Sequence, residues 1–328
     1  MQPSDQHLPW TMIGYCQTSM TRVLFIAISS LALVGLQREP ESKVTFIRNG
    51  QVYIWTTLDR KPQQLTSDPS VKRMPRWSPD GSRIVYWDAD DAKGSLGNLV
   101  VLRSDGVIVG RLPVAAVTPA GIRIEGMHGV EQIGWADDAD VFAQGNINPY
   151  ADEYRVLNID SREMHSFGGF GFATCALRGI TAFWKPVFPN DDTMVLADSR
   201  ETGPLFEIKE ARDLPTLNVP LTWDGGCDSI GFIDPRPPLR LVVISIRERK
   251  SQTKAVPQTL TDIHLEAAPD GFLIGPGSLL RYSVGTNKLE VTSEDLLTTL
   301  RKRHRGRRDA EKQLQASDSD WWPAQLTN

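Results

Sequence analysis

A short β-type run that ends in tryptophan and a tight turn occurs more than once in this chain. WSPDG at 77–81 and WADDA at 135–139 are each followed by a β-rich run, IVYW and VFAQ respectively. Weaker copies of the turn lie near residues 188, 234 and 268, so the five turns are 58, 52, 46 and 34 residues apart. A unit of this size cannot bury its apolar face alone, and stacked copies share one core. The spacing therefore predicts a repeat architecture.

Hairpin turns separate the runs between residues 43 and 290. VTFIR (44–48) and QVYIW (51–55) flank Asn49-Gly50, whose residues accept the positive φ values of a type I′ turn. No long helical periodicity occurs in this stretch. We therefore predict an all-β chain, with a β-propeller of five or six four-stranded blades over residues 43–292. KLEVT (288–292) could complete the last blade or supply a strand to the first.

Residues 51–87 resemble the TolB-type (WD-like) propeller repeat. Gln64-Leu65-Thr66, the WSPDG turn and Ile84 match that repeat position by position. TolB itself carries an α/β domain ahead of its propeller, whereas here the β pattern begins soon after an apolar run, so the resemblance concerns the repeat family. It implies a structural role for the turn, in which the tryptophan rings fill the wedge between neighbouring blades. The residues given this role are Trp77, Ser78, Pro79, Asp80, Gly81 and Trp135.

The apolar run VLFIAISSLALVGL at 23–36 predicts an export signal. As a helix its fourteen residues would span about 21 Å, short of a bilayer core of about 30 Å. It follows Met20-Thr21-Arg22, a short positive segment, so we expect Met20 to be the initiator. An uncleaved anchor helix and an ordinary buried helix are the alternatives. Residues 1–42 are thus an extension plus signal or anchor, and the expected location is periplasmic or secreted, with membrane anchoring if the signal stays uncleaved.

Cys175 and Cys227 are the two cysteines that follow the apolar run. An oxidising compartment would favour a disulfide between them. We expect both to lie in successive crossings between blades on one face of the propeller, where pairing is geometrically feasible. Two reduced, buried cysteines are the alternative.

Residues 293–328 are predicted to form a charged helical tail that is partly disordered. Ser293, Glu294 and Asp295 suit a helix N-terminus. RKRHRGRR at 301–308 could attach weakly to an anionic membrane surface, or could be a solvated helix face balanced by nearby acids. The cations concerned are Arg301, Lys302, Arg303, Arg305, Arg307 and Arg308.

Motifs of several enzyme classes are absent from the sequence. It has no G-x-S-x-G, H-E-x-x-H, C-x-x-C or phosphate-binding G-x-x-x-x-G-K, and its five histidines are scattered. The acidic segment WDADDAKG (87–94) lacks the full pattern of a calcium loop, so we interpret it as a solvated hairpin loop, with weak Ca²⁺ binding as the alternative. A formal net charge of −4 argues against a dedicated nucleic-acid binder. We predict no catalytic residue, metal ligand or cofactor.

The family analogy places recognition on the face formed by the loops between blades and the loops between each blade's two middle strands. The polar and aromatic residues expected there are Asp88, Asp90, Asn146, Asn148, Tyr150, Arg200 and Trp223. The function favoured is an extracytoplasmic propeller that binds a protein, peptide or glycan partner. The alternative is a propeller lyase or hydrolase with a channel-centred, metal-assisted site.

Overall fold

The computed structural model describes most of the chain after Ser42. The described residues are 42–89, 97–114, 116–117, 123–124, 127, 129–148, 151–185, 193–198, 204–208, 219–257, 260, 263–275 and 280–322. The predicted export signal at 23–36 therefore lies outside them.

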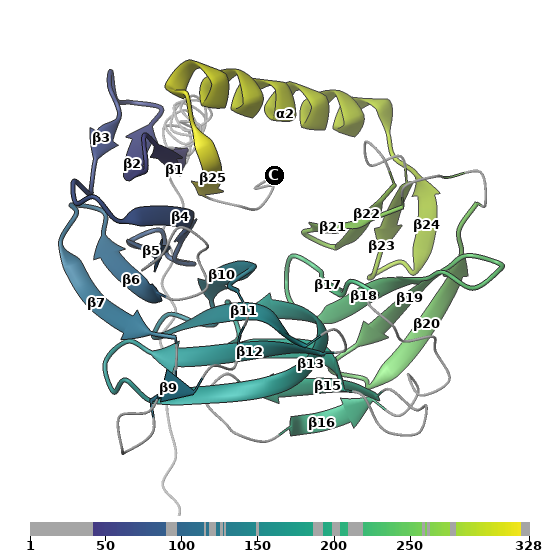
Figure 1. The fold of residues 1–328 in the computed structure, drawn as a ribbon. Coiled ribbons are helices and arrows are strands. Elements are labelled where there is room, and N and C mark those ends of the chain that lie inside the picture. Colours follow the sequence, from purple (N-terminus) through teal and green to yellow (C-terminus); the bar gives the residue numbers. More distant parts are fainter. Residues whose placement is uncertain are drawn as a thin grey trace, which may run out of the picture. The chain divides into compact units, whose positions relative to one another are not determined.

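Antiparallel sheets make up nearly all of this region, which confirms the predicted all-β class (Figure 1). The second sheet has the order β4-β5-β6-β7 and consists of β4 (Val71–Trp77), β5 (Arg83–Ala89), β6 (Gly97–Arg103) and β7 (Ile108–Pro113). Two later sheets have the orders β17-β18-β19-β20 and β21-β22-β23-β24. Their strands are β17 (Thr222–Trp223), β18 (Ser229–Asp234), β19 (Arg240–Ser245), β20 (Lys250–Ala255), β21 (Leu265–Ala268), β22 (Gly271–Ile274), β23 (Leu280–Ser283) and β24 (Lys288–Val291).

One sheet has seven strands because its long middle strand pairs on both sides. It comprises β10 (Gln132–Trp135), β11 (Asp140–Asn148), β12 (Ala151–Asn158), β13 (Met164–Cys175), β14 (Ile180–Lys185), β15 (Thr193–Asp198) and β16 (Pro204–Ile208). The first part of β13 pairs with β12 and its second part with β14. A separate short pair is formed by β8 (Ala116–Val117) and β9 (Arg123–Ile124).

The first sheet combines the two ends of the described chain. β1 (Lys43–Arg48), β2 (Gln51–Thr56) and β3 (Gln63–Gln64) follow one another, and β25 (Ser317–Trp322) pairs with the free edge of β1. The β1–β2 hairpin has the predicted turn, with φ of 52° at Asn49 and 72° at Gly50. β24 completes the last sheet, so the strand supplied to the first sheet is β25 and not the segment 288–292. No strand was predicted at 317–322.

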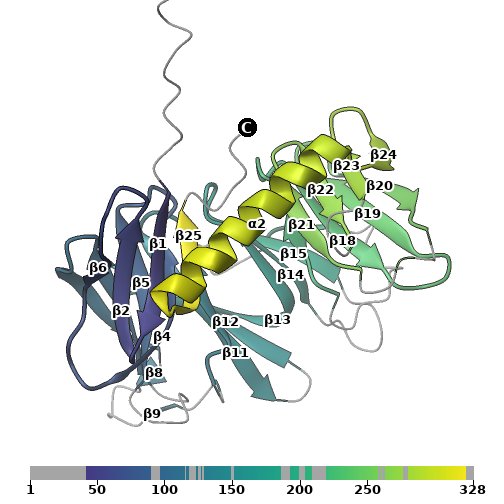
Figure 2. The ribbon, with the colours of Figure 1, turned by 90° about the horizontal axis from the view of Figure 1, so that it is seen from above.

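The predicted C-terminal helix is present as α2 (Glu294–Leu314). Ser293 caps it by accepting a 3.3 Å hydrogen bond from the Leu296 N–H on its Oγ. At one end Leu300 packs against the β21–β24 sheet, and at the other end Leu314 packs against β1 and β2. The helix therefore connects the last sheet to the first (Figure 2).

The turn between the first and second strands is built alike in three sheets. In each, the backbone N–H of a residue just after the first strand donates to the backbone carbonyl of the residue that begins the second strand, at 2.8–2.9 Å. The three pairs are Ser78 with Arg83, Ala136 with Asp140, and Asp224 with Ser229. The third copy follows Trp223, so the prediction of a copy at 234 was wrong. Asp234 ends β18, and the segment after it links the second strand to the third. The copy near 268 lies between β21 and β22 as expected, and the one near 188 falls outside the described residues.

Apolar side chains fill the spaces between successive sheets. Trp87 and Leu99 of the second sheet pack with Ile133 of β10, and Trp184 of β14 packs with Phe232 of β18. These side chains are almost wholly removed from water. The central strands of the middle sheets are apolar on both faces because a neighbouring sheet packs on either side of them.

Candidate functional site

A cavity of about 770 Å³ lies among strands of several sheets. Five of the strands that line it are edge strands, β4, β10, β17, β21 and β25, and the other two are β11 and the middle strand β13 of the seven-stranded sheet. Its aromatic lining consists of Trp77, Trp135, Phe142, Phe172, Trp223, Trp321 and Trp322. Its polar lining includes Arg76, Ser78, Gln132, Thr174, Thr222, Asp224 and Asp320.

Indole N–H groups fix several of these rings at the junctions between sheets. Trp135 Nε1 donates to the Arg76 carbonyl at 3.1 Å, from β10 to β4. Trp223 Nε1 donates to the Ala173 carbonyl at 2.9 Å, from β17 to β13. These bonds lock the orientation of large side chains that would otherwise leave a buried donor unpaired. The aromatic wall is therefore preformed.

Two carboxylic acids line the cavity, and burial raises the pKa of both. Asp320 accepts a 2.7 Å hydrogen bond from the Trp77 N–H, which opposes the rise, as do the charges of Arg76 and Arg307. Burial raises the pKa of Asp224 in the same way, against hydrogen bonds from backbone N–H groups in its turn. Desolvation disfavours the charged form of a carboxyl group, so these two acids are the titratable groups of interest here.

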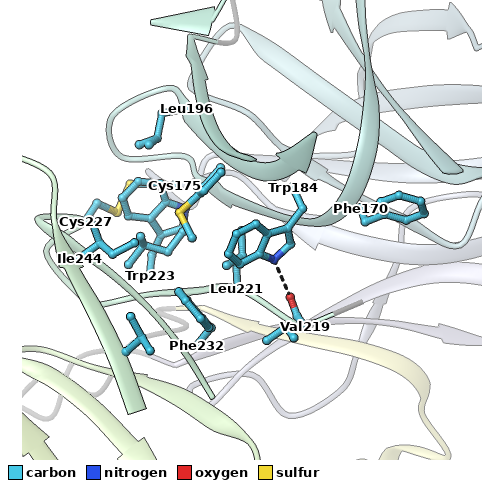
Figure 3. Packing of buried hydrophobic residues seen from close by; sticks show 14 residues of the cluster. Phe170, Cys175, Trp184, Leu196, Val219, Leu221, Trp223, Cys227, Phe232 and Ile244 are labelled. Carbon is cyan, nitrogen blue, oxygen red and sulfur yellow. Dashed lines mark hydrogen bonds between the residues drawn. A yellow bond between two sulfur atoms is a disulfide. The ribbon is translucent and has the colours of Figure 1, made fainter. Parts of the chain in front are cut away.

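Cys175 and Cys227 are joined by a disulfide beside this cavity, with their Cα atoms 6.1 Å apart. Figure 3 shows the bond next to Trp223, within the apolar cluster where Trp184 Nε1 donates to the Val219 carbonyl at 3.0 Å. Cys175 is the last residue of β13, before the turn to β14, and Cys227 lies in the turn between β17 and β18. Both positions connect strands within one sheet, so the expected location in crossings between blades was wrong. The bond connects the seven-stranded sheet to the β17–β20 sheet.

Of the seven predicted binding residues, Trp223 lines the cavity. Asp88 lies at the end of β5, buried, where it pairs with Arg111 at 2.5 Å and accepts a hydrogen bond from Ser70 Oγ. Asn146 lies in β11, and its Nδ2 is 3.4 Å from an Asp152 carboxylate oxygen. The structure does not bring Asp88 or Asn146 to the cavity.

The other four predicted binding residues have no described side chain. Asn148 is described only as part of the β11 backbone. Asp90, Tyr150 and Arg200 lie outside the described residues.

Several cavity residues were assigned a purely structural role or were missed. Trp77, Ser78, Pro79 and Trp135 line the cavity as well as forming the repeated turn. Asp80 holds that turn, because its carboxylate accepts from Ser78 Oγ at 2.5 Å and from the Ser82 N–H at 3.0 Å. The missed signal was TWDGGCDSI at 222–230, a further copy of the turn that places Asp224 directly after its tryptophan.

The described part of the chain contains no group of three or more His, Cys, Asp or Glu side chains that could hold a metal ion. Within that same part, no helix is both long and apolar enough to cross a membrane.

Known proteins resemble this chain in structure and not in sequence. No family model matches the chain, and no curated protein matches it. TolB from Acinetobacter baumannii aligns at 12% identity over 77% of this chain and 64% of its own, with a TM-score of 0.39. A eukaryotic initiation factor aligns at 12% identity over 77% of this chain and 61% of its own, with a TM-score of 0.49.

A puromycin-hydrolyzing peptidase of Mycobacterium tuberculosis aligns at 15% identity over 78% of this chain and 44% of its own, with a TM-score of 0.45. The present chain thus covers less than two thirds of each of these three proteins. At such identities the likeness concerns the fold alone.

Proposed function

We propose that residues 43–292, completed by β25, form a TolB-like β-propeller of six blades. The seven-stranded sheet counts as two blades that share β13, because different parts of that strand pair with β12 and with β14. Residues 293–328 then act as a closing tail, and residues 1–42 as the extension with the export signal or anchor. Closure of the first blade by β25 ties the two ends of the propeller together.

The function that the geometry supports best is a non-enzymatic, extracytoplasmic binding protein whose ligand is a protein segment, peptide or glycan. The observation that carries this proposal is the preformed cavity with tryptophan rings from four sheets. The rings of Trp321 and Trp322 are partly exposed, whereas those of Trp77, Trp135 and Trp223 are buried in the wall. Aromatic rings supply apolar contact area, and the few polar groups among them can fix the orientation of a ligand. The Cys175–Cys227 disulfide is consistent with an oxidising compartment.

Obstruction of the cavity tests this proposal. Thr222 lines the cavity on β17, so Thr222→Trp should fill part of it. Thr253→Trp makes the same exchange on β20, the outer strand of the same sheet, where the side chain is exposed. Both variants and the full wild-type chain would be applied to a peptide library and a glycan array. Ligands retained by wild type and Thr253→Trp but lost by Thr222→Trp support the proposal; ligands retained equally by all three place recognition elsewhere.

A second candidate function, a hydrolase or lyase, is favoured by the two buried acids of the cavity. A carboxylic acid with a raised pKa can serve as a general acid near neutral pH. Asp224 and Asp320 are the residues concerned. The test is whether the full chain cleaves a peptide or glycoside ligand identified by the library and the array. Cleavage that is lost in Asp224→Asn or Asp320→Asn, while binding stays intact, would establish this function over simple binding.

A further inference from the structure

Helix α2 is anchored at its ends and exposed between them. Its buried side chains are Leu297 and Leu300 in the first two turns and Leu314 at the last position. None of the residues from 301 to 313 is buried. The middle of the helix therefore connects two sheets while presenting most of its surface to solvent.

Four cations form a row along the exposed side of this helix. Arg301, Arg305, Arg308 and Lys312 are spaced by four, three and four residues, which places them on one face within about 16 Å. All four side chains are exposed. We call these four residues the cationic row.

The remaining cations of the 301–308 run do not belong to the row. Arg307 is half-buried on the opposite side, where its guanidinium lies 5.5 Å from the centre of the Trp321 ring, and burial lowers its pKa. Arg303 is half-buried on that side as well, and Lys302 is exposed between the two faces. The sequence run is therefore sorted by the helix into a packed side and an outward row.

Two acids of the helix lie close to the row, Glu294 near Arg301 and the exposed Asp309 between Arg305 and Lys312. Arg301 pairs with Glu294 at 3.0 Å, and both side chains are exposed. Exposed pairs of this kind contribute little to stability. No ion pair joins Arg305, Arg308 or Lys312 to a described acid. Like charges spaced by three or four residues on a helix repel each other, so an external anion would relieve an unfavourable arrangement.

We propose that the cationic row is a docking surface for an anionic phospholipid membrane. Guanidinium groups bind phosphate oxygens well, and each cation near such a surface contributes favourably to adsorption. The row contains no apolar side chain, so contact would be electrostatic and without insertion. The apolar run at 23–36 provides the second argument. An uncleaved anchor would keep the chain at a membrane surface, where a cationic row can also contact anionic lipid headgroups.

The test compares charge variants of the full chain on vesicles. The row variant replaces Arg301, Arg305, Arg308 and Lys312 by Gln. A matched control replaces four exposed, scattered cations by Gln: Arg60, Lys61, Lys250 and Lys288. Both variants change the formal net charge from −4 to −8, since each loses four positive charges. One set of vesicles contains phosphatidylcholine alone, and the other contains equal parts of phosphatidylcholine and phosphatidylglycerol. Binding to the neutral vesicles measures the contribution of residues 23–36, which wild type and both variants share.

We expect wild type to prefer the anionic vesicles, and the row variant to lose about tenfold or more of that preference. The scattered control should lose far less. Raising the salt to about 0.5 M, where the screening length is about 4 Å, should abolish the preference. Circular dichroism and a melting curve establish that both variants are folded.

Equal losses in the two variants would overturn the proposal, because net charge alone would then explain adsorption. Retention of wild type on polyphosphate or duplex DNA without preference for anionic vesicles would also overturn it, and would assign the row to a soluble polyanion.

Discussion

The carboxylate of Asp320 in β25 accepts a 2.7 Å hydrogen bond from the backbone N–H of Trp77 in β4, although 243 residues separate them. Asp318 accepts a second such bond from the Met74 N–H. The β4–β5 register shifts between Arg73 and Arg76, and Met74 has a φ of 52°. This irregularity directs N–H groups of β4 away from the ladder. Two carboxylates of the last strand therefore join the first sheet to the second.

Removal of the Asp320 acceptor should destabilise the fold, whereas removal of its charge should not. Asp320→Ala leaves the Trp77 N–H without its acceptor, and we expect a loss of about 1–3 kcal/mol in the free energy of unfolding. Asp320→Asn keeps an oxygen acceptor and removes a charge that burial disfavours, so its stability at pH 7 should equal or exceed that of wild type. Urea denaturation measures both. Equal losses in the two variants would mean that attraction to Arg76 and Arg307 outweighs desolvation.

Asp320 should also make the stability of the fold depend on pH. Burial raises the folded-state pKa of Asp320 above its ordinary value of 3.8. Between the two pKa values the folded state holds a proton that the unfolded state has released, so stability falls as pH rises through this interval. The stability of wild type relative to Asp320→Asn should therefore decrease from acid towards neutral pH and then level off.

A comparison of these two proteins at each pH isolates the effect from groups with the opposite behaviour. Asp68 is one of them. Burial raises its pKa, but hydrogen bonds from Lys72 and Ser70 have the larger combined effect and hold the pKa well below the usual range. Its contribution is present above the unfolded pKa and disappears as pH falls. A stability difference between wild type and Asp320→Asn that is constant with pH would show that Asp320 titrates normally.

Local pattern predicted the hairpins but not which segment closes the first sheet. The Asn49-Gly50 turn and the turn at 77–81 could be predicted because their own residues fix the backbone. β25 reads SDSDWW, which has no β-type alternation. It is a strand because β1 offers a free edge and because the N–H groups of β4 bind its carboxylates. Such long-range contacts leave no signal in a short sequence window.

The binding face was predicted from the loops of related folds, whereas the cavity is lined mainly by strands. Trp77 and Trp135 were predicted to have a structural role, and these buried rings also border the cavity. A repeated residue type can thus serve packing and lining together. The copy of the turn at Trp223 has Cys227, with φ of 56°, in the place of Gly81, which obscured the repeat.

Gly81 should tolerate alanine much less well than Gly50 does. Both have positive φ, 68° and 72° respectively. A Cβ on Gly81 would lie 2.4 Å from the Trp322 ring, whereas a Cβ on Gly50 would meet nothing within 4 Å. We expect Gly50→Ala to cost about 1–2 kcal/mol from backbone strain, and Gly81→Ala about 1–3 kcal/mol more from overpacking. Thermal or urea unfolding gives both values.

A double-mutant cycle separates the two causes at Gly81. In a Trp322→Ala background the ring is gone, so Gly81→Ala should cost no more than Gly50→Ala does. A cost that stays unchanged in this background would argue that contact with β25 does not restrict residue 81.

The Cys175–Cys227 disulfide should contribute strongly to stability because it closes a long loop. The two residues are 52 positions apart, and removal of such a bond typically costs about 2–5 kcal/mol. We expect the free energy of unfolding of the Cys175→Ser, Cys227→Ser double variant to be lower by this amount, so that it unfolds at a lower denaturant concentration. Cys16→Ser, outside the described residues, is the control and should unfold like wild type. Mass spectrometry without reductant checks the bond; free thiols at both Cys175 and Cys227 in the native protein would contradict the structure.

Truncation after Ala316 should open the first sheet, and a peptide should restore it. The shortened chain lacks β25, so β1 has an unpaired edge and loses cover from Trp321 and Trp322. Both side chains are partly buried, and together with the lost strand pairing we expect their removal to cost about 2 kcal/mol or more. A chain that ends at Trp322 is the control and should keep full stability.

Because β25 binds through backbone pairing and two carboxylates, a peptide of residues 316–328 should raise the melting temperature of the truncated chain as its concentration rises. The same peptide with Ala at positions 318 and 320 should do so only at higher concentration, and equal rescue by both peptides would assign closure to the pairing with β1 alone.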